Sequence, residues 1–153
     1  AGRPLVESRA NYKDMADDEY CWPAACWAAE SGIADGYGRR RFHAKWWITR
    51  EQAATMLFRY FYRRGMHTEW DRHTDLTPFQ GEKFISDYAH AAMEWATTYG
   101  LFQPERGGLH PKGSVSRAKA AELFLRFDAV LGQADAAEVN PRLAEQYEYD
   151  ALQ

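Results

Sequence analysis

The stretch FHAKWWITREQAATMLFRY (Phe42–Tyr60) decides the fold, because the chain repeats it as LHPKGSVSRAKAAELFLRF (Leu109–Phe127). The two stretches match at several positions without a gap. The matched pairs are His43 with His110, Lys45 with Lys112, Arg50 with Arg117, and Ala53 with Ala120. A repeat of this length predicts a chain that contains two copies of one supersecondary unit.

A second pair of stretches extends each unit toward the N-terminus. DEYCWPAACWAAESGI (Asp18–Ile33) aligns with SDYAHAAMEWATTYGL (Ser86–Leu101), and both end on a glycine followed by an aliphatic residue. Each stretch predicts a short helix, over about residues 23–31 and 89–99, which ends at Gly32 or Gly100 in the left-handed conformation. A polar loop, an extended segment and a second helix then follow in each unit.

The second helix of each unit begins after a side-chain acceptor, Thr49 or Ser116. Gln52 completes a capping box with Thr49, whereas Lys119 at the matching position predicts a weaker cap in the second unit. Apolar residues then recur at helical spacing, which predicts one buried stripe on each helix. The two stripes are Ala53, Leu57, Tyr60 and Phe61, and Ala120, Phe124, Phe127 and Leu131.

The repeats divide the chain into five segments. We expect an N-terminal lead-in over 1–10, a first repeat over 11–64, a connector over 65–78, a second repeat over 79–131 and a C-terminal extension over 132–153. Pro141 suits the first turn of a short helix in that extension. The expected fold class is mainly α, with tandem helix-loop-helix repeats packed into a helical bundle that carries short extended or loop prongs.

Composition limits the classes of function. The net charge of -3 argues against nucleic acid as a partner, although the segment 39–50 is locally basic. No apolar run has the length of a membrane span, and the first ten residues lack the apolar stretch of a signal peptide, so an exported protein would be the mature form or a fragment. The aromatic share of 15% exceeds what core filling normally requires, so some rings are expected to face a ligand or a partner.

Tryptophan, cysteine and histidine residues have expected roles that do not involve catalysis. Trp27 and Trp95 lie on the apolar sides of their helices and are expected in the core. Cys21 and Cys26 flank a helix start at Pro23, where the geometry is unfavourable for a disulfide, so we expect small buried or half-exposed thiols, with a disulfide as the alternative. The five histidines have no zinc spacing, and no nucleophile with a base, paired-carboxylate cleft or phosphate loop is evident. We therefore expect no metal, no cofactor, no catalytic residue and no enzyme activity.

The repeats resemble the S-layer homology family. Its pattern is matched in the first unit by YKD (Tyr12–Asp14), WAAESGIADG (Trp27–Gly36), FHAKWWITREQ (Phe42–Gln52) and LFRY (Leu57–Tyr60), and in the second by FQG, AMEWATTYGL, LHPKGSVSRAKA and LFLRF. The chain departs from the pattern where Gly81 replaces the counterpart of Asp14, Ala44 replaces a proline, and Pro104 replaces the counterpart of Gly36. Family members usually carry three units around a pseudo-threefold axis. This chain shows two units. Either one unit is missing, or two units suffice here, or chains associate to complete the arrangement.

The resemblance implies a secreted, non-catalytic module at the bacterial cell surface that binds secondary cell-wall polysaccharide, often bearing pyruvate ketals. A guanidinium can bind a ketal carboxylate with two donors, and helix N-termini favour anions through unpaired N–H groups, so Arg50 and Arg117 are candidate contacts. The alternative for both arginines is a structural salt bridge. Trp46 and Trp47 offer flat faces to sugar rings, and alternation along an extended segment predicts one ring inward and one outward. Asp14 and Gly36 complete the candidate glycan-binding set as family-like positions.

The segment Arg39–Trp47 supports a second hypothesis. Arg39, Arg40, Arg41 and the two tryptophans have no equivalents in the second unit. A solvated loop is the simpler interpretation of the three arginines. Since Trp, Tyr and Arg dominate protein interfaces, the segment could instead contact a protein partner or a second copy of the chain.

Overall fold

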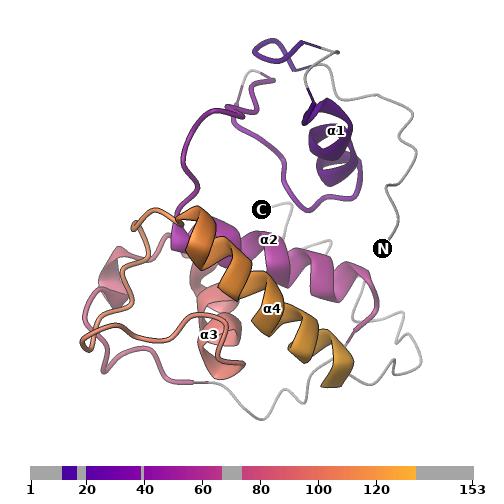
Figure 1. The fold of residues 1–153 in the computed structure, drawn as a ribbon. Coiled ribbons are helices and arrows are strands. Elements are labelled where there is room, and N and C mark those ends of the chain that lie inside the picture. The colour runs from indigo at the N-terminus through magenta and orange to yellow at the C-terminus, as the bar shows by residue number, and fades with distance from the viewer. Residues whose placement is uncertain (1–11, 17–19, 39, 67–73, 134–153) are drawn as a thin grey trace. The chain divides into compact units, whose positions relative to one another are not determined.

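The computed structural model describes residues 12–16, 20–38, 40–66 and 74–133. The lead-in 1–10 and the helix expected at Pro141 lie outside the described residues. The described chain contains four α-helices, two short 3-10 helices and isolated β-bridges, but no strand (Figure 1). The helices are α1 (Trp22–Glu30), α2 (Arg50–Arg63), α3 (His90–Thr98) and α4 (Arg117–Gln133), with η1 (Glu82–Phe84) and η2 (Asp87–Ala89) before α3. The mainly α fold class is thus confirmed.

The chain folds as two compact units, Ala1–Trp47 and Ile48–Gln153. The first contains α1, and the second contains α2, α3 and α4. The division falls inside the first sequence repeat, so the second helix of that repeat belongs to the same compact unit as the whole second repeat.

Both first helices end at the predicted glycines. Gly32 and Gly100 have φ angles of +61° and +69°, in the left-handed region. After each glycine the next N–H reaches back over the last turn: Ile33 donates to the Ala28 carbonyl at 2.8 Å, and Leu101 to the Ala96 carbonyl at 2.7 Å. The same C-terminal bond therefore closes α1 and α3.

The second helices begin as predicted. Thr49 Oγ1 accepts from the Gln52 N–H at 3.3 Å, and Gln52 Oε1 accepts from the Thr49 N–H at 2.9 Å, which completes the capping box of α2. Ser116 Oγ accepts from the Lys119 N–H at 3.2 Å. Lys119 has no acceptor to return the bond, so this cap is half of the box.

The segments that precede α2 and α4 pair with each other. Val115 N–H donates to the Ile48 carbonyl at 3.0 Å, Thr49 and Ser114 form an antiparallel bridge, and Arg50 N–H donates to the Gly113 carbonyl at 2.9 Å. Equivalent positions of the two repeats thus meet in the second compact unit. This pairing fixes the start of α2 against the chain that leads into α4.

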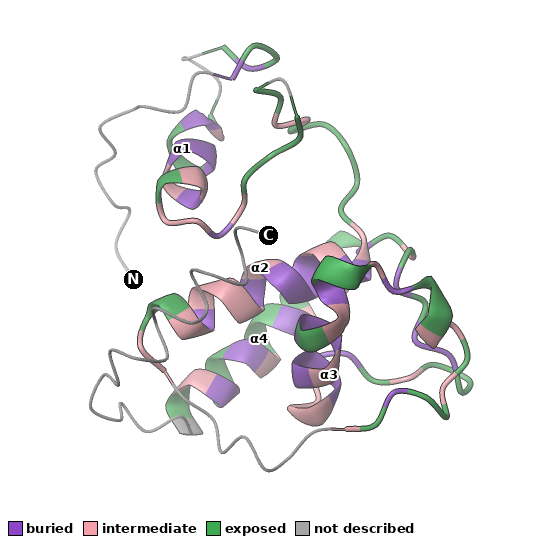
Figure 2. Cartoon of the chain, turned by 180° about the vertical axis from the view of Figure 1, so that it is seen from behind, coloured by how far each residue is buried: buried purple, intermediate pink, exposed green. Residues whose placement is uncertain are grey.

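The core of the second unit joins its three α-helices. α2 packs on α3, and Phe127 of α4 places its ring 5.9 Å from that of Tyr60 and 6.2 Å from that of Trp95. Figure 2 shows the buried faces of these helices. The largest fully buried side chains of this core are Phe61, Phe102, Met93, Leu101 and Leu109.

The predicted stripe is confirmed on α2, where Ala53, Leu57 and Phe61 are buried, and it is wrong at one position of α4. Phe124 is 62% exposed, whereas its neighbour Leu123 is 4% exposed. The buried residues Leu123, Phe127 and Val130 are four and three positions apart, so they form one face of α4, and Phe124 lies on the opposite flank of Phe127, toward solvent.

The tryptophan prediction is confirmed for Trp95, which is 4% exposed, and wrong for Trp27, which is half-buried. In the first unit α1 instead turns Trp22, Ala25 and Cys26 inward, and the Trp22 ring meets Tyr12 edge-on at 6.4 Å. The spacing of three and four between these residues leaves Trp27 beside the buried face. Cys21 is half-buried and Cys26 is buried, which agrees with the burial expected of them.

No helix in the described part of the chain combines the length and apolar character that a membrane crossing requires.

Candidate functional site

Asp14 anchors the aromatic loop of the first unit. Its Oδ1 accepts from the Phe42 N–H and its Oδ2 from the His43 N–H, both at 2.9 Å. Desolvation raises the pKa of Asp14, but these two N–H groups outweigh it, and the pKa lies below its ordinary value. The carboxylate also lies 3.4 Å from His43 Nδ1. Asp14 therefore holds His43 in a left-handed conformation, with a φ of 56°.

Gly36 shapes the same loop. It has a φ of +69°, and a Cβ at this position would lie 2.7 Å from the Arg41 carbonyl oxygen and 3.1 Å from Tyr12 Cε1. The close approach allows the backbone groups of Tyr37 and Arg41 to bond to each other at 2.6 and 3.2 Å. A side chain at residue 36 would push this turn open.

Trp46 and Trp47 both face solvent, with exposed fractions of 60% and 73%. The expectation that one ring points inward is wrong, because the segment turns: Trp46 N–H donates to the His43 carbonyl at 2.9 Å. The Trp46 ring stacks on the His43 ring with centroids 3.8 Å apart and planes 10° apart, and Tyr37 meets Trp46 at 5.5 Å. The loop thus presents one supported indole and a second one beside it.

The arginine cluster of this loop is described in part. Arg40 and Arg41 are exposed, whereas Arg39 lies outside the described residues. Arg40 has a φ of 57°, and its carbonyl accepts from the Lys13 N–H at 2.9 Å. With the exposed Lys45, these side chains give the aromatic loop a cationic rim.

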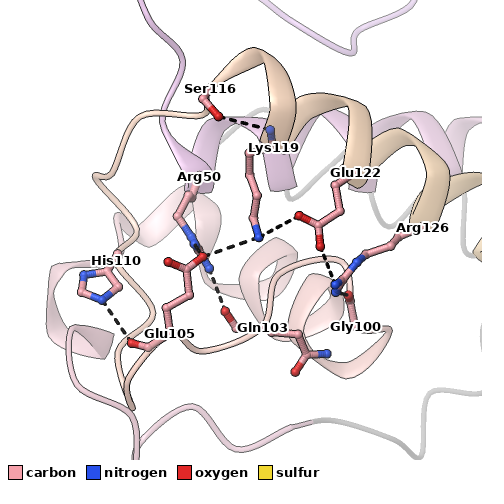
Figure 3. A network of polar contacts seen from close by, with 9 residues as sticks. All are labelled: Arg50, Gly100, Gln103, Glu105, His110, Ser116, Lys119, Glu122 and Arg126. Atoms are coloured by element: carbon pink, nitrogen blue, oxygen red, sulfur yellow. Dashed lines mark hydrogen bonds and ion pairs between the residues drawn. The ribbon is translucent and has the colours of Figure 1, made fainter.

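Arg50, in the second unit, is buried and paired. Its Nη1 donates to Glu105 Oε1 at 2.7 Å and its Nη2 donates to the Gln103 carbonyl at 2.9 Å (Figure 3). Its guanidinium carbon also lies 4.9 Å from the centroid of the Phe102 ring. The bond and charge of Arg50 hold the pKa of Glu105 below its ordinary value. Arg117, the sequence twin of Arg50, is exposed at the start of α4.

The expected unpaired N–H groups at the start of α2 are not available. Arg50 N–H donates to the Gly113 carbonyl at 2.9 Å, and Glu51 N–H donates to the Pro111 carbonyl at 3.1 Å. Gln52 N–H is bonded within the capping box. An anion at Arg50 would therefore receive no help from the N–H groups of the helix N-terminus.

A chain of alternating charges continues from Arg50 along α4. Lys119 Nζ lies 3.5 Å from Glu105 Oε1 and 3.2 Å from Glu122 Oε2, and Arg126 Nη2 lies 2.6 Å from Glu122 Oε1 (Figure 3). Arg126 Nη1 also donates to the Gly100 carbonyl at 2.6 Å. The Lys119–Glu122–Arg126 spacing of three and four is visible in the sequence, but the contact with Glu105 depends on the tertiary fold.

Glu51 is a second buried charge that sequence reasoning missed. Its side chain is 4% exposed and accepts from Ser86 N–H at 3.1 Å, Ser86 Oγ at 3.0 Å, Tyr88 Oη at 3.3 Å and Lys112 Nζ at 2.5 Å. Burial raises the pKa of Glu51, but Lys112 and Ser86 outweigh it, so the pKa is lowered. Glu51 thus ties α2 to the start of η2 and to the loop before α4.

Among the residues that the structure describes, no group of three or more His, Cys, Asp or Glu side chains is arranged to hold a metal ion.

Comparison with known proteins adds three findings. Residues 11–54 match the family model of the S-layer homology domain. The chain is similar to the surface-layer 125 kDa protein of Lysinibacillus sphaericus, with 26% identity over 125 residues, which is 79% of this chain and 10% of that protein. The chain thus spans about a tenth of the length of this relative. No solved structure matches it.

Proposed function

Since residues 11–54 of this chain match the S-layer homology domain, we propose that it is a non-catalytic module that binds anionic secondary cell-wall polysaccharide and anchors a surface protein. The family match and the surface-layer relative associate the chain with the bacterial cell surface. The proposal adds the ligand: a wall glycan that bears carboxylates, of which pyruvate ketals are the expected form.

The exposure of Trp46 and Trp47 is the observation that carries the proposal. Two adjacent indoles at 60% and 73% exposure leave a large apolar surface in water, which is typical of a surface that binds something. Their flat faces fit the apolar C–H faces of sugar rings. The stacking of Trp46 on His43, which Asp14 holds through its backbone N–H, keeps one of these rings in place before a ligand arrives.

Exposed cations in each unit suit an anionic glycan. In the first unit Lys45, Arg40 and Arg41 are exposed in the same loop as the two tryptophans, and in the second unit Arg117 is exposed at the start of α4. Guanidinium groups can bind a carboxylate through two parallel hydrogen bonds. We assign Arg117 as a direct contact for a ketal carboxylate, and Arg50 as a second contact, whose Nη1 is bonded to Glu105 in the free chain.

A pair of double variants tests the proposal. Trp46→Ala/Trp47→Ala is compared with Phe124→Ala/Leu125→Ala, which also removes two exposed apolar side chains, at 62% and 74% exposure. Retention on purified bacterial cell walls should fall at least about tenfold in the tryptophan variant, a loss of about 1.4 kcal/mol, and stay near the wild type in the control. Equal retention of both variants would sink the proposed role of the tryptophans.

A protein-binding or self-associating module is the second candidate. The exposure of Phe124 and Leu125 on α4 favours it, in addition to the Arg39–Trp47 loop, because an apolar pair of this size on a helix can seat another chain. Sedimentation over a range of protein concentrations should then show a dimer that Phe124→Lys abolishes. A chain that stays monomeric and captures no protein from surface extracts counts against this candidate.

A further inference from the structure

Glu105 is the exposed partner of a buried cation. Its side chain is 55% exposed, whereas that of Arg50 is 7% exposed, and the two are joined by a 2.7 Å bond from Nη1 to Oε1 (Figure 3). The neighbouring Nη2 is already bonded to the Gln103 carbonyl. The other terminal nitrogen of Arg50, Nη1, therefore points to the place where the Glu105 carboxylate lies.

The same carboxylate oxygen meets a second cation. Lys119 Nζ lies 3.5 Å from Glu105 Oε1, and Lys119 belongs to the first turn of α4, whereas Arg50 begins α2. One oxygen thus lies between cations from the two repeats. The geometry is that of a carboxylate-binding site in which the chain supplies the carboxylate itself.

The site is incompletely satisfied. Arg50 Nε is buried without a hydrogen-bond partner in the described structure. Glu105 accepts one hydrogen bond from the guanidinium, whereas a bidentate carboxylate would accept two. A buried donor without a partner costs free energy that a better-fitting acceptor would recover. The Phe102 ring, 4.9 Å from the guanidinium carbon, holds the guanidinium in place for such an acceptor.

Release of Glu105 requires a rotation of its side chain and no movement of its backbone. Glu105 and Gly108 exchange two backbone hydrogen bonds at 2.9 Å, and the turn between them contains Arg106 and Gly107 with φ angles of 50° and 81°. Gln80 N–H also donates to the Gly107 carbonyl at 3.0 Å. The loop is therefore fixed, while the half-exposed carboxylate can turn into water. Ion pairs with an exposed partner contribute little to stability, so a ligand can compete with this one.

We propose that Glu105 is a specificity-determining residue: it occupies the carboxylate position on Arg50 and Lys119, and only a glycan that brings its own carboxylate can replace it. This inference rests on the proposed function. When Glu105 turns away, a neutral sugar leaves Arg50 without a counter-charge and Lys119 with Glu122 alone, so it gains nothing at this site. A neutral glycan is disfavoured because its binding would break the Arg50–Glu105 ion pair without replacing it.

The affinity of the site for a carboxylate ligand depends on the fraction of molecules in which Glu105 has turned away. A half-exposed ion pair favours the closed arrangement by only a few-fold. Glu105→Gln, which keeps the shape of the side chain and removes its charge, should therefore bind a carboxylate ligand about three- to fivefold more tightly than the wild type. Glu105→Asp, which keeps the charge but withdraws it by one methylene, should also bind more tightly.

Glu122→Gln is the matched control. It makes the same change in net charge. Glu122 also contacts Lys119, at 3.2 Å, but its second cation is Arg126 of α4, whereas that of Glu105 is Arg50. Calorimetric titration of the full chain uses two probes, a synthetic methyl hexopyranoside with a 4,6-linked pyruvate ketal and the methyl ester of that ketal. We expect Glu105→Gln to strengthen binding of the acid, with no effect on the ester, and Glu122→Gln to resemble the wild type.

The other results overturn the inference. Equal affinities of Glu105→Gln and Glu122→Gln for the acid would show that Glu105 does not compete, while the proposed function would stand if the wild type binds. Loss of the far-UV circular dichroism of the wild type in both Glu105 variants would make Glu105 a structural partner of Arg50. Failure of every variant to bind the acid, together with failure of the wild type to bind purified wall polysaccharide, would overturn the inference and the proposed function together.

Discussion

Replacement of Glu51 by glutamine tests the account of the fold at its most specific contact. Glu51 Oε2 accepts from Ser86 N–H at 3.1 Å, and Oε1 accepts from Ser86 Oγ at 3.0 Å and from Lys112 Nζ. An amide has one oxygen, so one of these two positions becomes an NH₂ group that faces a donor, whichever way the amide is turned.

The magnitude follows from the burial of the partners. A hydrogen bond to a charged group contributes about 1.5–3 kcal/mol, and the Ser86 bonds are partly buried. Lys112 is 54% exposed, so water can hydrate its ammonium group, and the loss of its ion pair adds only about 0–1 kcal/mol. Glu51→Gln should therefore lower the free energy of unfolding by about 1.5–4 kcal/mol.

Urea denaturation followed by far-UV circular dichroism measures this change. Glu122→Gln serves as the control, because Glu122 is a 42% exposed carboxylate with Lys119 and Arg126 as partners, and its replacement should have a much smaller effect on the free energy of unfolding. If Glu51→Gln costs no more than this control, the reasoning that makes Glu51 a buried tie between the two repeats is refuted.

Three further perturbations have defined outcomes. Phe127→Ala, which empties a 6% exposed core position, should destabilise the chain by about 3–5 kcal/mol in urea, whereas Phe124→Ala at 62% exposure should cost less than about 1 kcal/mol; similar costs would contradict the assigned face of α4. Gly36→Ala should destabilise the first unit by about 1–3 kcal/mol, because it adds a Cβ 2.7 Å from a carbonyl oxygen at a positive φ, and unchanged melting would contradict the turn. The folded-state pKa values of Glu51 and Glu105 lie below 4.5, so the unfolded chain binds more protons; stability should be fully present above about pH 4.5 and fall as pH drops through the folded values. Urea titrations between pH 3 and 7 measure this slope, and Glu51→Gln should flatten it.

The sequence predicts the local structure of the repeats because local physics determines it. A threonine followed three residues later by glutamine satisfies the orphan N–H groups at a helix start, and the capping box of Thr49 and Gln52 is present. Gly32 and Gly100 adopt the left-handed conformation that ends their helices. The buried stripe of α2 follows from the spacing of its apolar residues in the same way.

Features that depend on distant parts of the chain could not be predicted in this manner. Phe124 and Leu123 both fit an amphipathic helix, and only the packing of Phe127 on Tyr60 and Trp95 decides which of them is buried. Trp46 and Trp47 point outward because a turn to His43 replaces the expected extended segment.

The partners of the two buried charges are also set by the tertiary fold. Glu105 and Lys112 lie 55 and 61 residues from Arg50 and Glu51, respectively, and no local pattern relates the members of either pair. The repeat alignment makes Arg50 and Arg117 equivalent, but one is buried and paired whereas the other is exposed. Neighbours from the second repeat therefore decide what Arg50 can do.

Titration of the full chain with purified secondary cell-wall polysaccharide, before and after mild acid removal of its pyruvate ketals, tests the central claim most directly. We expect saturable binding to the intact polysaccharide that Trp46→Ala/Trp47→Ala weakens, and at least about tenfold weaker binding after the ketals are removed. Equal affinity for the two polysaccharides, or no binding to either, would contradict the claim that this module recognises an anionic wall glycan.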